Sequence, residues 1–192
     1  MTEQELIACL IKGNENAFKT VVDTYKNMVY NTVLGFVQNM EDAEDVTQDV
    51  FIKVYENIGR FKQQCKLSTW IYRISITQAA DFIRHKKRKK RAGFLSGLFG
   101  LNNELLHDPP DFIHPGVLTE NKERSAILFK AINQLPEKQK TAFMLQKMQD
   151  LSQQKIAEIM ELNEGAVESL LMRAKGNLKK LLINYYSSEY EK

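Results

Sequence analysis

The chain has 192 residues, 43% of them hydrophobic and 27% charged, and carries a formal net charge of +3 at pH 7. These proportions are typical of a globular protein with one ordinary core or two small ones. No run approaches the roughly 20 apolar residues that a membrane span needs, and the acidic N-terminus argues against a secretory signal. Cys9 and Cys65 have no CxxC partner. We therefore expect two ordinary thiols, a reducing cytoplasm and no membrane insertion.

Helical spacing of apolar residues dominates the first 108 residues, which contain no proline. Thr2 and Glu5 fit a capping box for a first helix that Gly13 would stop, and Asn14 fits the cap of a second helix. Two longer helices are predicted from about Met40 to Phe61 and from about Ser68 to Lys90.

Glycines and prolines break the helical period over residues 92–120, and this composition predicts a flexible linker. After it, helical segments are predicted at about 120–133, 136–148, 152–160 and 163–184. The sequence therefore predicts an all-α fold of two small helical domains, residues 1–91 and 121–192, joined by the linker.

A basic run closes the fourth predicted helix. Residues 84–91 carry seven of the chain's 27 Lys and Arg, and the remaining 20 face 24 Asp and Glu, a net charge of −4. Positive charge this concentrated is typical of phosphate contact. A solvated basic segment or a nuclear-type address is the alternative.

The third predicted helix has two contrasting faces. Its core stripe is Ala43, Val46, Val50, Val54, Ile58 and Phe61. Another face carries Asp42, Asp45, Asp49 and Glu56, with Ile52 among them. An apolar residue within a charged rim is typical of a protein–protein contact. A solvated face that neutralises the basic run, or a carboxylate metal site, stays open as an alternative.

The fourth predicted helix has an apolar face marked by Ile71, Ile74, Gln78 and Phe82. Its remaining face carries Trp70, Arg73, Thr77, Arg84, Lys87 and Arg88. Basic side chains neutralise phosphates and Trp offers a stacking plane for an unpaired base, so this face favours nucleic-acid binding. Core packing is the alternative for Trp70.

Near the C-terminus, the apolar spacing is typical of a helix-turn-helix. Small Ala157 would let the two helices touch, and Asn163 fits the cap of the second. The outer face of that second helix holds Gly165, Glu168, Ser169, Met172, Arg173, Gly176, Lys179 and Lys180. Glu161 occupies a turn position that usually holds Gly, which leaves the turn geometry in question. An ordinary helical hairpin is the alternative.

Three motifs occur in one order: Asp42–Phe51, then Leu67–Ile74 leading into the basic run, and last Leu135–Gln139 followed by the helix-turn-helix with Val167–Lys175. This combination resembles the bacterial RNA polymerase sigma factors of the extracytoplasmic-function (ECF) group, in the sigma-70 family. The resemblance covers about residues 14–91 and 124–182.

The resemblance implies a transcription initiation factor without enzymatic activity, catalytic residues, metal or cofactor. Residues 1–91 would form a region 2-like domain that binds core RNA polymerase and opens the minus-ten element. Residues 121–192 would form a region 4-like domain that reads the minus-thirty-five element. The implied partners are core RNA polymerase, promoter DNA and an anti-sigma factor, and the chain would be monomeric.

The resemblance also implies roles for individual residues. Core polymerase binding is implied for Asp42, Asp45, Gln48, Asp49, Phe51 and Ile52. Minus-ten DNA binding is implied for Arg60, Lys66, Trp70, Arg73, Thr77, Arg84, Lys87 and Arg88. DNA binding by the helix-turn-helix is implied for Gln153, Gly165, Glu168, Ser169, Met172, Arg173 and Lys179.

The chain departs from the family's pattern in its reading helix and its turn. Many members have a basic residue where Glu168 stands and Arg where Leu170 stands, so promoter preference does not carry over. Glu161 is the second departure.

Two other functions compete with this interpretation. A stand-alone helix-turn-helix regulator would need no acidic contact face. A metal-dependent nuclease would use Asp42, Asp45 and Asp49. Independently of that hypothesis, a cluster in the linker could bind a metal ion: His107, Asp108, Asp111 and His114.

Overall fold

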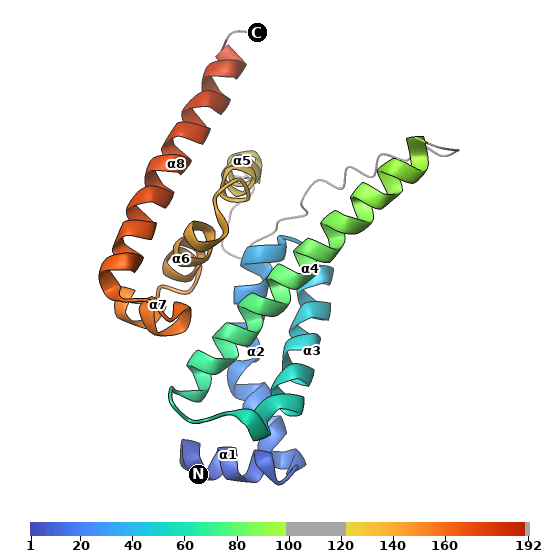
Figure 1. Cartoon of the computed structure of the whole chain (residues 1–192), viewed down its shortest axis with the longest axis vertical. Helices are drawn as coiled ribbons and strands as arrows, with labels where there is room; N and C mark the ends of the chain where they lie inside the picture. Colours follow the sequence, from blue (N-terminus) through green and yellow to red (C-terminus); the bar gives the residue numbers. More distant parts are fainter. Residues whose placement is uncertain (99–121, 191–192) are drawn as a thin grey trace. The chain divides into compact units, whose positions relative to one another are not determined.

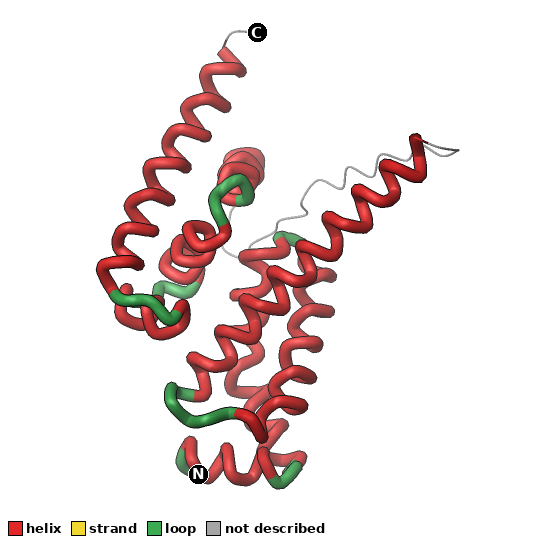
Figure 2. Tube along the Cα trace, in the orientation of Figure 1, coloured by secondary structure: helices red, strands yellow, loops and turns green. Residues whose placement is uncertain are grey.

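The computed structural model describes the backbone of residues 1–98 and 122–190, with side chains for 1–89, 124–183 and 185. Every regular element in these ranges is helical (Figure 2). The described chain therefore confirms the predicted all-α fold. The linker cluster of His107, Asp108, Asp111 and His114 lies outside the described residues.

The described helices form two compact units (Figure 1). The first unit holds Met1–Arg60 and the chain from Ile74 onward along the fourth helix. The second unit holds Phe61–Arg73 and the C-terminal helices. In chain order the first helices are α1 (Glu3–Ile11), α2 (Glu15–Val37), α3 (Met40–Asn57), the short 3-10 helix η1 (Ile58–Arg60) and α4 (Leu67–Leu98). The C-terminal helices are α5 (Lys122–Ile132), α6 (Glu137–Met148), α7 (Gln153–Met160) and α8 (Glu164–Tyr190).

Short polar side chains begin the helices of the first unit, as predicted. Thr2 and Glu5 form the capping box: the Glu5 N–H donates to Thr2 Oγ1 at 3.2 Å and the Thr2 N–H donates to Glu5 Oε2 at 2.8 Å. Asn14 Oδ1 accepts from the Ala17 N–H at 3.0 Å and so caps α2. Each cap satisfies a backbone donor that the first helical turn leaves without a partner. Gly13, with a φ of +74°, stops α1 in a conformation that favours glycine.

The core of the first unit is built mainly where α2 and α3 pack together. Helix α3 ends at Asn57, before the predicted Phe61, but the predicted stripe is buried at every position: Ala43, Val46, Val50 and Val54 of α3, Ile58 of η1, and Phe61 after it. Val21, Val29 and Val33 of α2 are fully buried as well. This stripe fixes the rotation of α3 about its own axis, and therefore decides which α3 side chains face outward.

Helix α4 is longer than predicted, and it buries Ile71 of the predicted apolar face more completely than the rest of that face. It continues to Leu98, so residues 92–98 of the predicted linker are helical. Gly93 and Gly97 each cost a helix only about 1 kcal/mol relative to Ala, which a long helix tolerates. The fully buried positions of α4 include Leu67, Ile71, Ser75 and Ala79, one per turn. The predicted core positions Ile74, Gln78 and Phe82 are only half-buried.

The second unit contains the helix-turn-helix. Ser152 caps α7 by accepting the Lys155 N–H, and Asn163 caps α8 by accepting the Ala166 N–H at 2.8 Å. The two helices bury a common set of apolar residues: Ile156, Ala157, Ile159, Val167, Leu171, Ala174 and Leu178. The predicted role of Ala157 fits this packing, since its small side chain is buried. Burial of this set orients the opposite face of α8 toward solvent.

Candidate functional site

The outer face of α3 carries an apolar residue within a charged rim. Ile52 is 52% exposed, although most isoleucines of the described chain are buried or half-buried. Asp45, Gln48 and Asp49 are exposed around it. We call Asp45, Gln48, Asp49 and Ile52 the α3 outer face. Its geometry follows directly from the buried valine stripe on the opposite side of the helix.

Two residues that were predicted on this face behave differently. Phe51 is only 6% exposed and belongs to the core of the first unit, which corrects its predicted place on a contact surface. It lies next to the valine stripe, where an aromatic ring gains more from burial than from solvent. Asp42 is half-buried, and its carboxylate forms an ion pair with Lys86 of the basic run. For Asp42, the alternative interpretation therefore holds: this acid neutralises part of the basic run.

An open pocket of about 400 Å³ lies in the first unit beside α3 and α4. It is lined by Val46, Asp49, Gln78, Asp81, Phe82, Arg84, His85 and Arg88. The pocket thus brings together Asp49 of the α3 outer face and two arginines that were predicted to contact DNA. Arg84 also forms an ion pair with Asp81, one turn earlier on α4.

The exposed cations of the predicted minus-ten set lie along α4 and just before it. Lys66, Arg84, Lys87 and Arg88 are exposed, as are Thr77 and Arg60. Trp70 is half-buried and stacks on Phe61, with ring centroids 4.9 Å apart and ring planes at 28°. This stacking holds the indole in a fixed orientation at the start of α4.

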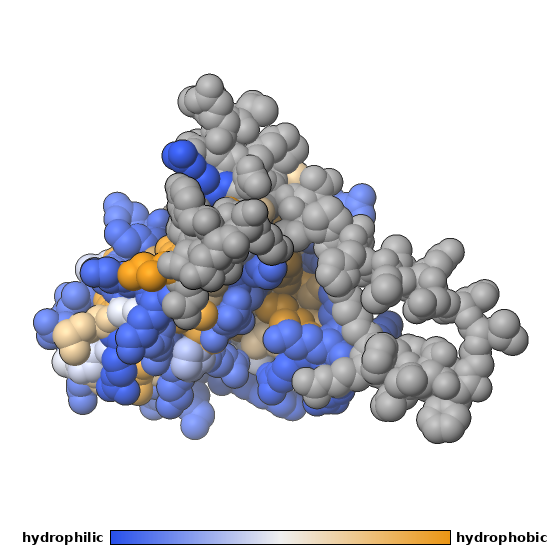
Figure 3. Space-filling view, turned by 90° about the horizontal axis from the view of Figure 1, so that it is seen from above, coloured by the Kyte–Doolittle hydropathy of each residue, from blue (hydrophilic) through white to orange (hydrophobic). Residues whose placement is uncertain are grey.

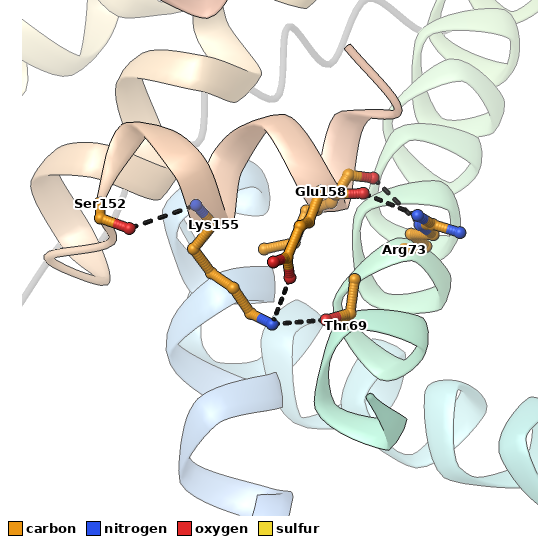
Figure 4. Close-up of polar contacts among 6 residues, drawn as sticks. Thr69, Arg73, Ser152, Lys155 and Glu158 are labelled. Atoms are coloured by element: carbon orange, nitrogen blue, oxygen red, sulfur yellow. Dashed lines mark hydrogen bonds and ion pairs between the residues drawn. The ribbon is translucent and has the colours of Figure 1, made fainter. Parts of the chain in front are cut away.

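Within the second unit, a polar cluster joins the start of α4 to α7 (Figure 4). Arg73 donates to the backbone oxygens of Glu158 and Ile159, at 2.6 and 3.1 Å, and forms an ion pair with Glu161 at 2.7 Å. Lys155 Nζ donates to Thr69 Oγ1 at 2.6 Å and to Glu158 Oε2 at 2.9 Å. The hydrogen bond from Lys155 is the main cause that lowers the pKa of the Glu158 carboxyl.

The partners of Arg73 at the end of α7 were not among the sequence predictions. The hydrogen-bonded residues are 85 and 86 positions apart in the chain, and no local spacing signals such a pair. The unusual Glu161 was the single available hint. Its φ of 55° and ψ of 45° place it in the left-handed conformation that the turn requires. The predicted helix-turn-helix turn is therefore formed, at a backbone cost of about 1 kcal/mol for a non-glycine residue.

The outward face of α8 presents its predicted residues to solvent. Glu168, Arg173 and Lys179 are exposed, Met172 is 70% exposed, and Ser169 is half-buried. A Cβ atom built on Gly165 would meet only Asn163 Oδ1, at 3.7 Å, so packing within the described chain does not require a glycine there. Gln153 is exposed at the start of α7.

Surface chemistry of the described residues is mainly polar. Figure 3 shows hydrophilic residues over most of the described surface on the face that it presents. In the described part of the chain, no three His, Cys, Asp or Glu side chains are placed to hold a metal ion. Asp42, Asp45 and Asp49 of the nuclease hypothesis are therefore not placed to hold a metal ion together.

None of the described helices is long and apolar enough to cross a membrane.

Two protein families match the chain in the predicted order. Sigma-70 region 2 matches residues 21–89, and Sigma-70, region 4 matches residues 125–178. The first match covers most of α2, all of α3, and α4 into its basic run; the second match covers the helix-turn-helix.

Three similar proteins match nearly the whole chain. The ECF RNA polymerase sigma factor SigW of Bacillus subtilis is 33% identical over 175 residues, which are 89% of this chain and 91% of SigW. The ECF RNA polymerase sigma-E factor of Escherichia coli is 30% identical and covers 91% of each chain. The RNA polymerase sigma-H factor of Pseudomonas aeruginosa is 29% identical, over 94% of this chain and 93% of its own.

Two solved structures have a similar fold. CnrH, in complex with the cytosolic domain of CnrY, matches with a TM-score of 0.65 and 19% identity, over 95% of this chain and 97% of that chain. The sigma factor RpoE of Bartonella quintana, in complex with the anti-sigma factor NepR, matches with a TM-score of 0.57 and 21% identity, over 86% of this chain and 96% of that chain. Together with the matches along the whole sequence, the acidic α3 and the helix-turn-helix place this chain in the ECF group of sigma-70 family RNA polymerase sigma factors, which are transcription initiation factors and not enzymes.

Proposed function

We propose that this ECF sigma factor binds core RNA polymerase through the α3 outer face and promoter DNA through α4 and α8. The observation that carries the proposal is the 52% exposed Ile52 among exposed carboxylates, in a chain that also presents a polar reading face on α8. A stand-alone regulator requires the reading face of α8 but does not require the α3 outer face. The chain would act as a monomer in the cytoplasm, where it meets the polymerase.

The α3 outer face suits a protein partner with a basic rim and an apolar pocket. Ile52 provides the apolar centre, and Asp45 and Asp49, both N-terminal to it on α3, provide negative charge. Charged rims mainly steer association and fix register, whereas the buried centre contributes more of the affinity. Asp42 would contribute less, because Lys86 already neutralises it.

The minus-ten surface combines charge with a stacking plane. Lys66, Arg84, Lys87 and Arg88 are exposed cations that can follow a phosphate backbone. Trp70, held by Phe61, would stack on an unpaired base near the start of α4. Opening a base pair costs a few kcal/mol, which stacking and phosphate contacts together would offset.

The reading face of α8 suits the major groove of duplex DNA. Glu168 can accept from a cytosine amino group, and the exposed Met172 can contact a thymine methyl group. Arg173 and Lys179 would bind phosphates. Gly165 presents no side chain at the start of the helix, which permits a close approach of the DNA there.

We also propose that an anti-sigma protein binds this chain. Support comes from the two solved structures of similar fold, since the sigma factor RpoE is bound there to the anti-sigma factor NepR and CnrH to the cytosolic domain of CnrY. Pull-down of this protein from the native cell would identify such a partner, and reconstitution with the purified partner would test the binding.

Promoter opening by reconstituted holoenzyme tests the proposed DNA surfaces. Permanganate reacts with unpaired thymines, so it would map the strand region that the holoenzyme opens. We expect a double Lys87→Ala, Arg88→Ala variant to bind polymerase normally and to reduce opening. Lys175→Ala, an exposed lysine of α8 outside the proposed reading set, is the control for lost positive charge. Equal opening by all variants would remove the α4 cations from the proposal.

A further inference from the structure

Helix α8 contains a glycine at an exposed position in its interior. Gly176 lies near the middle of α8, and the helix continues through it without a break (Figure 1). Glycine destabilises the interior of a helix relative to alanine, because it loses more backbone freedom on folding. A Cβ atom built on Gly176 would meet no atom within 4 Å. Packing within the described chain therefore gives no reason for a glycine at this position.

Gly176 lies on the same face of α8 as the proposed reading residues. It follows Met172 by four residues and Gly165 by eleven, and both intervals are close to whole turns of a helix. The opposite face is the buried one, with Val167, Leu171, Ala174 and Leu178. The exposed glycine is therefore on the side of α8 that faces the DNA under the proposed function.

Three exposed cations are neighbours of Gly176 on the helix surface: Arg173, Lys179 and Lys180. Arg173 comes three residues before the glycine, and the two lysines come three and four residues after it. Residues at these intervals have Cβ atoms about 5–6 Å apart on a helix. None of the three cations forms an ion pair with another described residue. The helix backbone at Gly176 is thus accessible at the centre of a positively charged patch.

From these observations we propose that Gly176 is a site of close approach, where the sugar–phosphate backbone of duplex DNA lies directly against α8. The inference rests on the proposed function, because α8 faces duplex DNA only under that proposal. The first turns of a reading helix meet base edges, and Gly176 lies beyond them, where a phosphate is the expected neighbour. Because this face continues from the proposed base contacts, the position favours DNA over an acidic protein surface.

The absence of a side chain at Gly176 affects all three cations together. A methyl group or a longer side chain at this position would hold a phosphate farther from Arg173, Lys179 and Lys180. The attraction between charges falls with distance, so each of these contacts would weaken. Close approach therefore gives a physical reason for a residue that lowers the stability of α8: the glycine favours DNA binding at the expense of the helix.

Substitutions at Gly176 should change stability and DNA binding in opposite directions. Alanine and leucine are better helix formers than glycine, so Gly176→Ala and Gly176→Leu should raise the midpoint of thermal unfolding of the full-length protein by about 2–6 °C. Both variants should bind a short, fluorescein-labelled duplex of mixed sequence more weakly. We expect a loss of about threefold or more for Gly176→Ala, and a larger loss for the longer side chain of Gly176→Leu.

Gly59→Ala is the matched control for this substitution. Gly59 is exposed in η1, and a Cβ atom there would also meet no atom within 4 Å. The control adds the same methyl group to a different helix and should bind the duplex as its parent does. All proteins in the comparison carry Lys87→Ala and Arg88→Ala, so that the basic run contributes less to the measured affinity.

Arg173→Ala, measured in the same assay, separates the possible failures. If Arg173→Ala weakens duplex binding but Gly176→Ala binds as tightly as its parent, the close approach at Gly176 is overturned. A lower midpoint of thermal unfolding together with weaker binding would attribute the loss to a distorted helix, and would also overturn it. If neither Arg173→Ala nor the Gly176 variants weaken binding, the proposed DNA-binding role of α8 itself fails.

Discussion

Truncation of Ile52 is the perturbation that isolates the α3 outer face. Complete burial of an isoleucine side chain contributes about 1.5–3 kcal/mol. Because 52% of Ile52 is exposed in the first unit, a partner that covers it would gain roughly half of this, about 0.8–1.5 kcal/mol. Ile52→Ala should therefore weaken binding to core RNA polymerase by about three- to tenfold.

Ile11 provides an internal control for this measurement. It is 51% exposed, almost equal to Ile52, but lies at the end of α1 and outside the proposed surface. Both substitutions remove the same atoms from half-exposed positions, so each should change the free energy of unfolding by less than about 1 kcal/mol. The assay is competition of each variant with fluorescently labelled wild-type protein for purified core polymerase.

The comparison of Ile52→Ala with Ile11→Ala decides whether Ile52 lies in the polymerase contact. We expect Ile11→Ala to compete as well as the wild-type protein and Ile52→Ala to compete several-fold less well. If the two variants compete equally, Ile52 is not at the centre of the polymerase contact. The assignment of the α3 outer face would then be refuted, whatever the fate of the DNA-binding surfaces.

Three further predictions concern charge and pH. Reversal of Asp45 and Asp49 to Lys should abolish polymerase binding yet leave duplex DNA binding intact; simultaneous loss of both activities would indicate misfolding. Arg173→Ala should weaken duplex binding by the full-length protein and lower the slope of log affinity against log salt by about one unit, and an unchanged slope would exclude Arg173 from the phosphate contacts. Burial raises the pKa of Tyr72 above its usual 10.0. The neutral side chain therefore stabilises the folded state fully below pH 10, and this stabilisation is lost as the pH rises through the raised pKa. Tyr72→Phe should unfold at nearly the same urea concentration as the wild-type protein at pH 8 and at a higher one in strong alkali. A variant with the same alkaline sensitivity as the wild-type protein would contradict this reasoning.

The near-neutral effect of Tyr72→Phe follows from the geometry of its hydroxyl. Tyr72 Oη donates to Gln149 Oε1 at 3.4 Å, which is long for a hydrogen bond. Phe keeps the buried ring and removes only this weak bond, so the change in unfolding free energy should stay below about 1 kcal/mol.

Features that depend on neighbours in sequence were predictable. The valine stripe of α3 and the exposed Ile52 follow from a period of 3.6 residues, which reports one face of one helix. The caps Asn14 and Asn163 follow from local side-chain chemistry at a helix start. The departure at Glu161 is visible in the sequence because the backbone conformation of a helix-turn-helix turn depends on neighbouring residues.

Features that depend on packing were not predictable in the same way. Phe51 lies beside the stripe, and only the packing of the first unit decides that its ring is buried. Ser75 of α4 is fully buried although its polarity favours the surface, and Phe82 on the predicted apolar face is half-buried. The partners of Arg73 come from a helix far along the chain, and no periodicity within α4 indicates them.

Transcription by reconstituted polymerase tests the central claim most directly. Purified core RNA polymerase would transcribe a promoter library in multiple rounds with and without this protein, and the RNA 5′ ends would be mapped. The account predicts specific start sites that appear only when the protein is present, and that disappear with the Asp45→Lys, Asp49→Lys double variant. Unchanged start sites, from a protein that still binds duplex DNA, would contradict it.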